Sequence, residues 1–148
     1  MSQVSSSDST ELWRSVTDAW KKLYRASERN LSGLGLSIPE LRVLKLLHKS
    51  TPVTMAGLSK ELMLTQAAMT GLVDRLEEEG LADRVRSKED RRIVRIALTT
   101  KGERVFREAE KIHRQFVEKV LESVEDEEIL ELSSVLNKLA KASEQLLP

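Results

Sequence analysis

A cluster of basic side chains lies in one short segment of the chain. Residues 83–101 contain seven basic and three acidic residues, whereas the whole 148-residue chain has 24 of each and no net charge. Such a cluster can bind phosphate groups, and an arginine at a hairpin tip can enter the minor groove of DNA. The alternative is a solvated cluster of surface ion pairs, which would contribute at most about 1 kcal/mol to stability.

The acidic charge is concentrated elsewhere, since residues 121–132 contain six acidic and no basic residues. Because the charges are segregated along the chain, the neutral total does not describe what any one surface presents. The run from Glu125 to Glu128 is most simply the first turn of a helix, where carboxylates interact favourably with the helix dipole.

The composition excludes several kinds of site. The chain has no cysteine, which excludes a disulfide framework and a thiol redox switch and fits a cytoplasmic location. His48 and His113 each stand alone on a predicted helix, so we expect structural roles for them, with no metal and no cofactor. The serine-rich residues 1–10 are predicted to be a mobile tail, and no apolar run is long enough to span a membrane.

Apolar periodicity predicts a mainly α-helical chain with one β-hairpin. Ser37, followed by Pro39 and Glu40, is typical of a helix start with a capping box, and Val53 is expected to form at most a short bridge. In chain order we expect a helix from Glu11 to about Leu31, helices capped by Ser37, Thr54 and Thr65, strands over Leu81–Arg86 and Arg92–Leu98, and helices over Thr99–Leu121 and Glu125–Leu146.

The side chains expected in the core recur at helical spacings or alternate along the second strand. They are Leu41, Val43, Leu44, Leu47, Leu58, Leu62, Met69, Leu72, Val73, Leu76, Val94, Ile96, Leu98, Val105, Ala109, Ile112, Phe116, Val120, Ile129, Leu132, Val135, Leu136 and Leu139.

The central elements form a helix-turn-helix followed by a wing. The fourth helix begins with small or uncharged residues, and its acidic run, Glu77 to Glu79, lies at the other end. A helix that enters the major groove needs such a start, because bulky or acidic residues there would clash with the groove or repel phosphates. Gln66 can pair with adenine, and threonine or alanine can contact a thymine methyl group. The alternative is an ordinary amphipathic core helix.

The hairpin resembles the wing of the MarR (multiple antibiotic resistance regulator) family, which reads D-x-R-x-x-x-V/I-x-L-T-x-x-G. The matching residues are Asp90, Arg92, Ile96, Leu98, Thr99 and Gly102. The segments "LSIPELRVLKLL" and "LTQAAMTGLVDRLEEEGLADRVR" are similar to other parts of the family, so the resemblance spans about residues 11–146. One departure is Ala67, where the family often has serine or proline, and it puts one DNA contact in doubt.

The resemblance implies a single domain over residues 11–148. It is expected to be mainly α with a small β-hairpin wing: a winged helix-turn-helix lobe over residues 37–102, and a helical dimerisation region formed by residues 11–36 and 103–148. Apolar residues near both ends are compatible with a homodimer, although they could instead close the core of one chain. They are Leu12, Trp13, Leu132, Leu136, Leu146 and Leu147.

We expect Arg92 to probe the minor groove, Arg91 and Lys88 to contact phosphates, and Arg84 and Arg86 to add charge, while Asp90 accepts hydrogen bonds that hold the tip. The complete set predicted to form the DNA surface is Thr54, Thr65, Gln66, Ala67, Thr70, Arg75, Arg84, Arg86, Lys88, Asp90, Arg91 and Arg92.

The family also implies control by a small aromatic or phenolic anion. Lys22, Tyr24 and Arg25 could supply two cations and a ring for it, or could simply be solvated. The chain is therefore predicted to be a homodimeric regulator, most commonly a repressor, that binds double-stranded DNA at a pseudo-palindromic operator and has no catalytic activity. The rival interpretations are a winged-helix adaptor for protein partners and a helical enzyme subunit.

Overall fold

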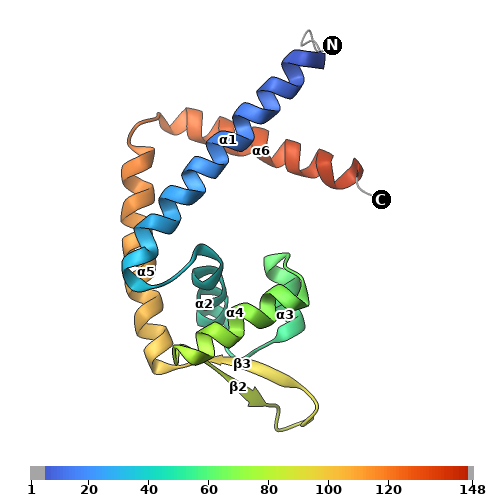
Figure 1. The fold of residues 1–148 in the computed structure, drawn as a ribbon, viewed down its shortest axis with the longest axis vertical. Helices are drawn as coiled ribbons and strands as arrows, with labels where there is room; N and C mark the ends of the chain where they lie inside the picture. Colours follow the sequence, from blue (N-terminus) through green and yellow to red (C-terminus); the bar gives the residue numbers. More distant parts are fainter. Residues whose placement is uncertain (1–5, 147–148) are drawn as a thin grey trace. The chain divides into compact units, whose positions relative to one another are not determined.

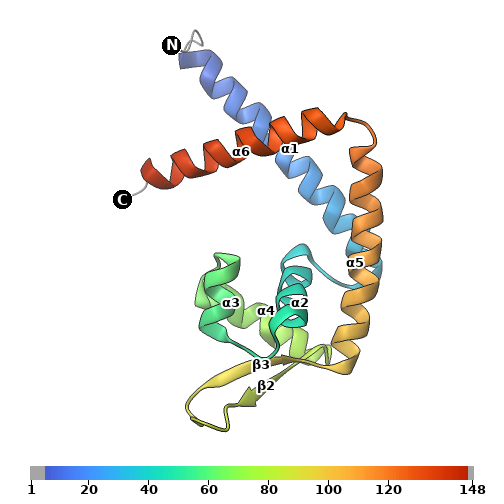
Figure 2. The ribbon, with the colours of Figure 1, turned by 180° about the vertical axis from the view of Figure 1, so that it is seen from behind.

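The computed structural model describes residues 6–146 and confirms a mainly helical fold with one small sheet (Figures 1 and 2). The chain divides into two compact units, one ending at His113 and the other beginning at Arg114, and each is described by itself. The elements in chain order are α1 (Ser6–Leu31), the 3-10 turn η1 (Ser32–Leu34), α2 (Ile38–Ser50), β1 (Val53–Thr54), α3 (Met55–Leu62), α4 (Gln66–Glu78), β2 (Ala82–Arg86), β3 (Val94–Leu98), α5 (Thr100–Leu121) and α6 (Asp126–Leu146).

Side-chain caps fix where the helices of the first unit begin. The Ser37 hydroxyl accepts a hydrogen bond from the Glu40 amide (3.3 Å), and the Glu40 carboxylate accepts one from the Ser37 amide (2.7 Å). The hydroxyls of Thr54, Thr65 and Thr99 likewise accept from the amide three residues later. These bonds satisfy amides that have no partner inside a helix, and they confirm the caps predicted from the sequence.

The predicted hairpin forms, and a short third strand joins it. The strand order is β1-β3-β2, with all pairs antiparallel. β2 and β3 pair from Ala82 opposite Leu98 to Arg86 opposite Val94, and Val53 pairs with Ile96 on the other side. The central strand β3 is therefore held along both edges, while the loop between β2 and β3 projects beyond the helices (Figure 1).

The core of the first unit is built mainly by α2, α3 and α4, which lie together on one side of the sheet (Figures 1 and 2). The apolar faces predicted for these three helices are confirmed: all of their predicted positions are buried except Leu72, which is partly buried and packs against the others. Burial of this much aliphatic surface is the main favourable contribution to the fold.

In β3 and α5, three sequence-based expectations for the core are wrong. Val94 is 38% exposed, because it pairs with Arg86 at the far end of β3, beyond the helices, whereas Ile96 is fully buried. Phe106 was not expected in the core, yet it is buried and its ring packs 4.8 Å from that of His48. Val120 is exposed, because it lies beyond the part of α5 that packs in the first unit.

The apolar side chains of the terminal helices are largely exposed in the single chain. In α6 the expected core positions are exposed apart from Ile129, which is partly buried. Leu12 and Trp13 on α1 are also exposed, whereas Leu147 lies outside the described residues.

The first helix begins at Ser6 rather than at Glu11. Asp8 lies in its first turn, where a negative charge stabilises the helix dipole, so residues 6–10 are helical instead of part of a tail. Residues 1–5 of the expected tail lie outside the described range. Over residues 6–146, no helix combines the length and apolar character needed to cross a membrane.

A close backbone approach joins α5 to the segment that follows α4. A Cβ atom on Gly102 would clash with the carbonyl oxygen of Leu81, so the position requires glycine. Next to it, the Thr99 amide donates to the Leu81 carbonyl (3.2 Å) and the Thr99 hydroxyl donates to the Gly80 carbonyl (2.7 Å). This junction fixes the base of the hairpin to the start of α5.

We predict that Gly102→Ala lowers the free energy of unfolding by about 1–3 kcal/mol, because the added methyl group forces the two backbones apart. Gly71→Ala is the matched control: nothing lies within 4 Å of its Cβ position, and alanine in a helix interior should stabilise by roughly 0.5–1 kcal/mol. Urea unfolding measures both values. Equal stability of Gly102→Ala and the parent chain would contradict the close approach.

Candidate nucleic-acid interface

The N-terminal end of α4 presents an exposed surface without charge. Gln66, Ala67 and Thr70 are exposed, while Met69 on the other face is buried in the core. The first turn of α4 contains no acidic residue. Its free amides and the positive end of the helix dipole can therefore meet a phosphate without local repulsion.

The turn before α4 contains an unusual residue that sequence reasoning missed. Met63 has a positive φ of 52° and is 82% exposed, so a large apolar side chain stands at the helix-turn-helix corner. The Leu64 amide donates to the Ser59 carbonyl (3.0 Å), which closes the end of α3. Glycine is the usual residue in such a left-handed conformation. Because this position holds methionine, the sequence carries no sign of the left-handed backbone here.

The tip of the wing is held by hydrogen bonds of its own. The Asp90 carboxylate accepts from the Arg92 amide (2.9 Å), in agreement with the expectation that Asp90 accepts hydrogen bonds that hold the tip. The buried Ser87 hydroxyl accepts from the Glu89 amide (3.3 Å), and the Ser87 amide donates to the Ile93 carbonyl (3.0 Å). The loop therefore has a defined shape, with the side chains of Lys88, Arg91 and Arg92 exposed around it.

Basic side chains converge at the wing. Arg86, Lys88 and Arg91 line one depression with Ser87. Arg86 and Lys88 also line a second one together with Arg95, which was not among the predicted site residues. Arg95 lies on β3 opposite Val85, so only the pairing of the strands reveals that it joins the same surface. An arrangement of cations without an enclosed cavity suits an extended polyanion such as DNA.

Arg84, predicted to add charge to this surface, is bound to α4 instead. Its guanidinium donates to the Asp74 carboxylate (2.5 Å) and to the carboxylate of Glu77. The hydrogen bond to Asp74, followed by smaller contributions from Glu77, raises the pKa of Arg84 above its ordinary value. The structure thus joins the wing to α4 through this side chain.

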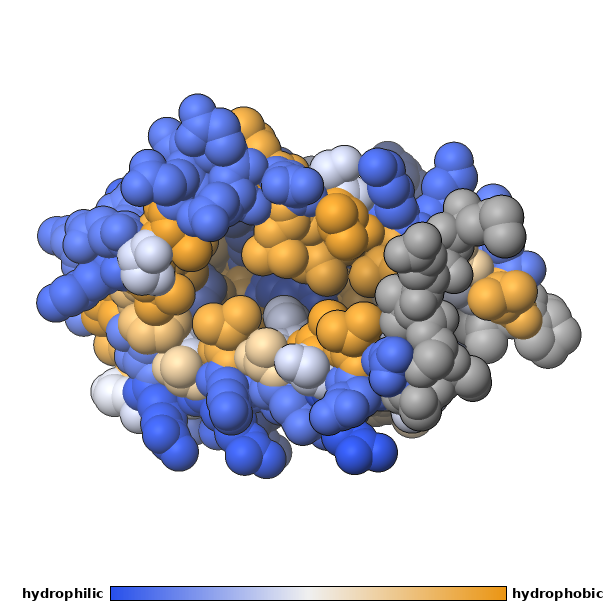
Figure 3. Space-filling view, turned by 90° about the horizontal axis from the view of Figure 1, so that it is seen from above, coloured by the Kyte–Doolittle hydropathy of each residue, from blue (hydrophilic) through white to orange (hydrophobic). Residues whose placement is uncertain are grey.

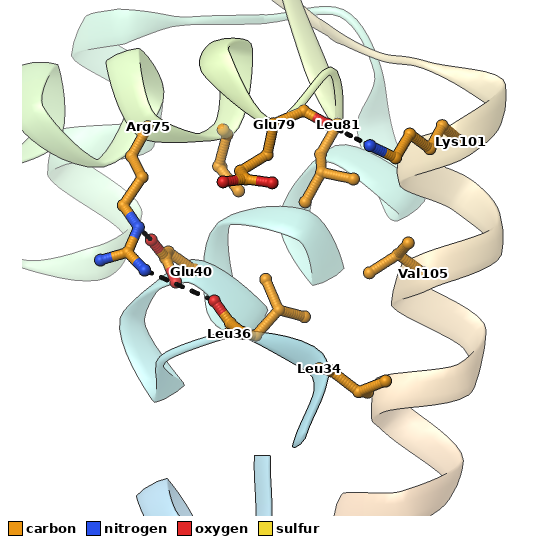
Figure 4. Close-up of a pocket in the computed structure, with 10 residues that line it drawn as sticks. Leu34, Leu36, Glu40, Arg75, Glu79, Leu81, Lys101 and Val105 are labelled. Atoms are coloured by element: carbon orange, nitrogen blue, oxygen red, sulfur yellow. Dashed lines mark hydrogen bonds and ion pairs between the residues drawn. The ribbon is translucent and has the colours of Figure 1, made fainter. Parts of the chain in front are cut away.

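Arg75 also has a partner inside the chain. Its Nε lies 3.0 Å from a carboxylate oxygen of Glu40, which is 98% buried at the start of α2. The pair borders a cavity of about 270 Å³, half of whose remaining lining residues are leucines, and the Lys101 ammonium group donates to the Glu79 carbonyl at its far side (Figure 4). Arg75 therefore joins α4 to α2, and its place as a DNA contact stays a prediction.

The residues predicted to bind an effector lie on α1, and neither the cavity beside Arg75 nor the depressions of the wing include them. Tyr24 packs its ring 5.6 Å from that of Trp20, and burial, followed by a hydrogen bond to Glu28, raises the pKa of its hydroxyl group. Lys22 and Arg25 are exposed. A separate cavity of about 170 Å³ between α2 and α5 is lined by Ile38, Leu41, Arg42, Lys45, Phe106, Glu110 and His113, a set that contains none of the three.

The comparisons with known proteins decide the family. The sequence profile of the MarR family matches residues 36–94. The transcriptional repressor YetL of Bacillus subtilis is 34% identical over 125 residues, which cover 81% of this chain and 73% of that protein. The chain belongs to the MarR family. It is therefore a transcriptional regulator of MarR type, and the resemblance seen in the wing sequence is confirmed.

Two solved structures share the fold of this MarR-family chain. Streptococcus pneumoniae FabT, in complex with DNA, has a TM-score of 0.77 and 32% identity, with 95% of this chain and all of that chain covered. The organohalide-sensing regulator RdhR-CbdbA1625, in its 2,4-dichlorophenol-bound form, has a TM-score of 0.84 and 27% identity, with 93% of this chain and 82% of that chain covered.

Proposed function

We propose that this chain is a homodimeric repressor that binds a pseudo-palindromic operator in double-stranded DNA and is released by a small aromatic anion. The observation that carries the proposal is the exposed, uncharged start of α4 in the same compact unit as a rigid, basic wing. DNA-binding regulators work where the chromosome is, which supports the predicted cytoplasmic location. The repressor YetL and the DNA complex of FabT support repression and DNA binding.

In this proposal α4 contacts the edges of the bases, and the wing contacts the DNA backbone. Gln66 pairs with an adenine edge, and the methyl groups of Ala67 and Thr70 contact thymine. Thr54 and Thr65 stand at the starts of α3 and α4, where a hydroxyl and a helix amide can together bind one phosphate.

The wing supplies the cations. Arg92 is the proposed minor-groove probe, because the hydrogen bond from its amide to Asp90 fixes the backbone from which the side chain extends. Arg86, Lys88 and Arg91, which share one depression, contact phosphates. Arg95 is added to this set because it lines the neighbouring depression.

The terminal helices supply the dimer contacts. Trp13 and Trp20 on α1 are 55% and 62% exposed, and Leu132 and Leu136 on α6 are 58% and 44% exposed. Figure 3 shows apolar side chains, coloured orange, at the surface among hydrophilic ones, coloured blue. A soluble chain rarely leaves so much apolar surface uncovered, and a two-fold dimer that buries it would space two recognition helices by about 34–36 Å along DNA.

The effector part of the proposal is supported by the dichlorophenol-bound form of RdhR-CbdbA1625. A phenolic anion needs a cation and an apolar wall. Lys22 and Arg25 offer cations on α1, and Tyr24, packed against Trp20, offers the ring.

DNA binding is tested by gel shift with fragments flanking the chain's own gene at several salt concentrations. We expect nanomolar specific binding whose log K falls by about 0.9 per neutralised phosphate for each unit of log salt. Arg92→Ala should weaken operator binding by about 1–3 kcal/mol, the worth of one groove contact. Arg107→Ala, which removes an exposed charge from α5, should bind like the parent. If no fragment is bound specifically, the result would favour the alternative interpretation, a winged-helix adaptor for protein partners.

Dimerisation is tested by sedimentation at low micromolar concentration. The parent chain should sediment as a dimer of 16.7 kDa subunits. Leu136→Asp should be monomeric, since it places a charge on the apolar face of α6. Ser134→Asp adds the same charge on the opposite side of that helix and should remain dimeric. A dimeric Leu136→Asp would exclude this face from the interface.

The effector site is tested by tryptophan fluorescence, because Trp20 lies beside Tyr24. Salicylate at millimolar concentration should change the emission and weaken operator binding, and Arg25→Ala should reduce both responses. Benzyl alcohol, a ring without the anion, serves as the control. If salicylate changes neither emission nor DNA affinity, this ligand class is wrong.

A further inference from the structure

Arg84 is held by three bonds to one turn of α4. Its two guanidinium nitrogens reach Asp74 and Glu77, and its own backbone amide donates to the Glu77 carboxylate (3.0 Å). Asp74 and Glu77 are three residues apart, so both carboxylates lie on the same side of the helix. One strand residue is thus fixed to α4 by its side chain and by its backbone.

The charges around Arg84 do not suit a phosphate contact. One guanidinium faces two carboxylates at bonding distance, so the group as a whole is negative. A phosphate that approached Arg84 would meet both carboxylates as well. The guanidinium would also have to give up hydrogen bonds to charged partners, which are among the stronger bonds in a protein.

The position of Arg84 within the sheet makes it suited to set the direction of the wing. Arg84 lies at the middle of β2, opposite the fully buried Ile96 of β3. At this level of the hairpin, β3 is therefore anchored in the core and β2 is bonded to α4. Beyond Arg84, β2 continues for two residues to Arg86, about 7 Å at a strand rise of roughly 3.3 Å per residue, and the tip loop follows. A tilt of the strand at this level therefore displaces the tip residues by an amount that grows with their distance from Arg84.

We propose that Arg84 is a positioning residue of the DNA-binding surface: through Asp74 and Glu77 it fixes the wing relative to α4, and it does not itself bind phosphate. The inference rests on the proposed DNA-binding function and replaces the charge-supplying role predicted for Arg84 from the sequence. It also explains why α4, a helix proposed to approach DNA, carries Asp74 and Glu77: their carboxylates hold Arg84 in place.

The acidic partners give the sharpest test. Removing a carboxylate near DNA ordinarily strengthens binding, because repulsion of phosphate is lost. If Asp74 and Glu77 hold the wing through Arg84, then Asp74→Asn and Glu77→Gln should each weaken operator binding instead, by about tenfold. Glu78→Gln removes the neighbouring exposed charge of α4 and should bind as tightly as the parent or more tightly. Thermal unfolding of each variant checks that it is folded at the assay temperature.

The salt dependence separates positioning from phosphate contact. Arg84→Met should weaken operator binding by about tenfold with an unchanged slope of log K against log salt, whereas Arg86→Met should reduce the slope by about 0.9. Combining Arg84→Met with Asp74→Asn should weaken binding no more than either change alone. A reduced slope for Arg84→Met, or binding by Asp74→Asn and Glu77→Gln at or above the parent's level, would overturn the inference and leave the proposed function standing.

A measurement without DNA keeps the two proposals distinct. The chain has no cysteine, so spin labels can be placed at Lys88→Cys on the wing and Lys49→Cys on α2. The distance distribution between the labels should broaden when Arg84→Met is added, and Arg86→Met should leave it unchanged. An unchanged distribution with Arg84→Met refutes the positioning role even if no operator is found, whereas failure of the parent chain to bind any DNA refutes the proposed function alone.

Discussion

The close approach of Gly102 to the Leu81 carbonyl is the constraint on which the DNA-binding unit depends. At this point the end of α4, the base of the hairpin and the first turn of α5 meet, and the Thr99 hydroxyl donates to the Gly80 carbonyl beside it. Lys101 adds a bond to the carbonyl of Glu79 (2.6 Å) at that helix end. Helix α4 therefore ends, and the wing begins, at one rigid junction, and this junction largely sets their orientation relative to each other.

The basic residues of the unit fall into two groups with different physical roles. Arg75 and Arg84 are neutralised by carboxylates inside the fold and connect α4 to α2 and to β2. Arg86, Lys88 and Arg91 gather around a depression of the wing and are not part of those ion pairs. Because a guanidinium paired with carboxylates must give up those charge-assisted hydrogen bonds to bind a phosphate, only the second group offers its full charge to a polyanion. The count of cations in the sequence thus overstates the charge available to DNA.

The apolar faces of the terminal helices α1 and α6 differ in burial from those of the winged helix-turn-helix lobe. In the lobe, apolar side chains on three short helices meet one another and the sheet, and they are buried. On α1 and α6 the same helical periodicity leaves residues such as Trp20 and Leu132 exposed in the single chain. Periodicity identifies a face that avoids water, but it does not say whether the partner of that face belongs to the same chain.

The sequence by itself determined the local structure. Caps such as Ser37 with Glu40 act within three residues, so the starts of the helices capped by Ser37, Thr54 and Thr65 could be predicted. The hairpin and the part that Asp90 plays at its tip also depend on residues close in sequence. Only the tertiary structure decided that Phe106 is buried, that residue 102 must be glycine because it approaches the Leu81 carbonyl, and that Arg84 pairs with Asp74. These features depend on which elements pack together, and pairs distant in sequence become neighbours only when the core has formed.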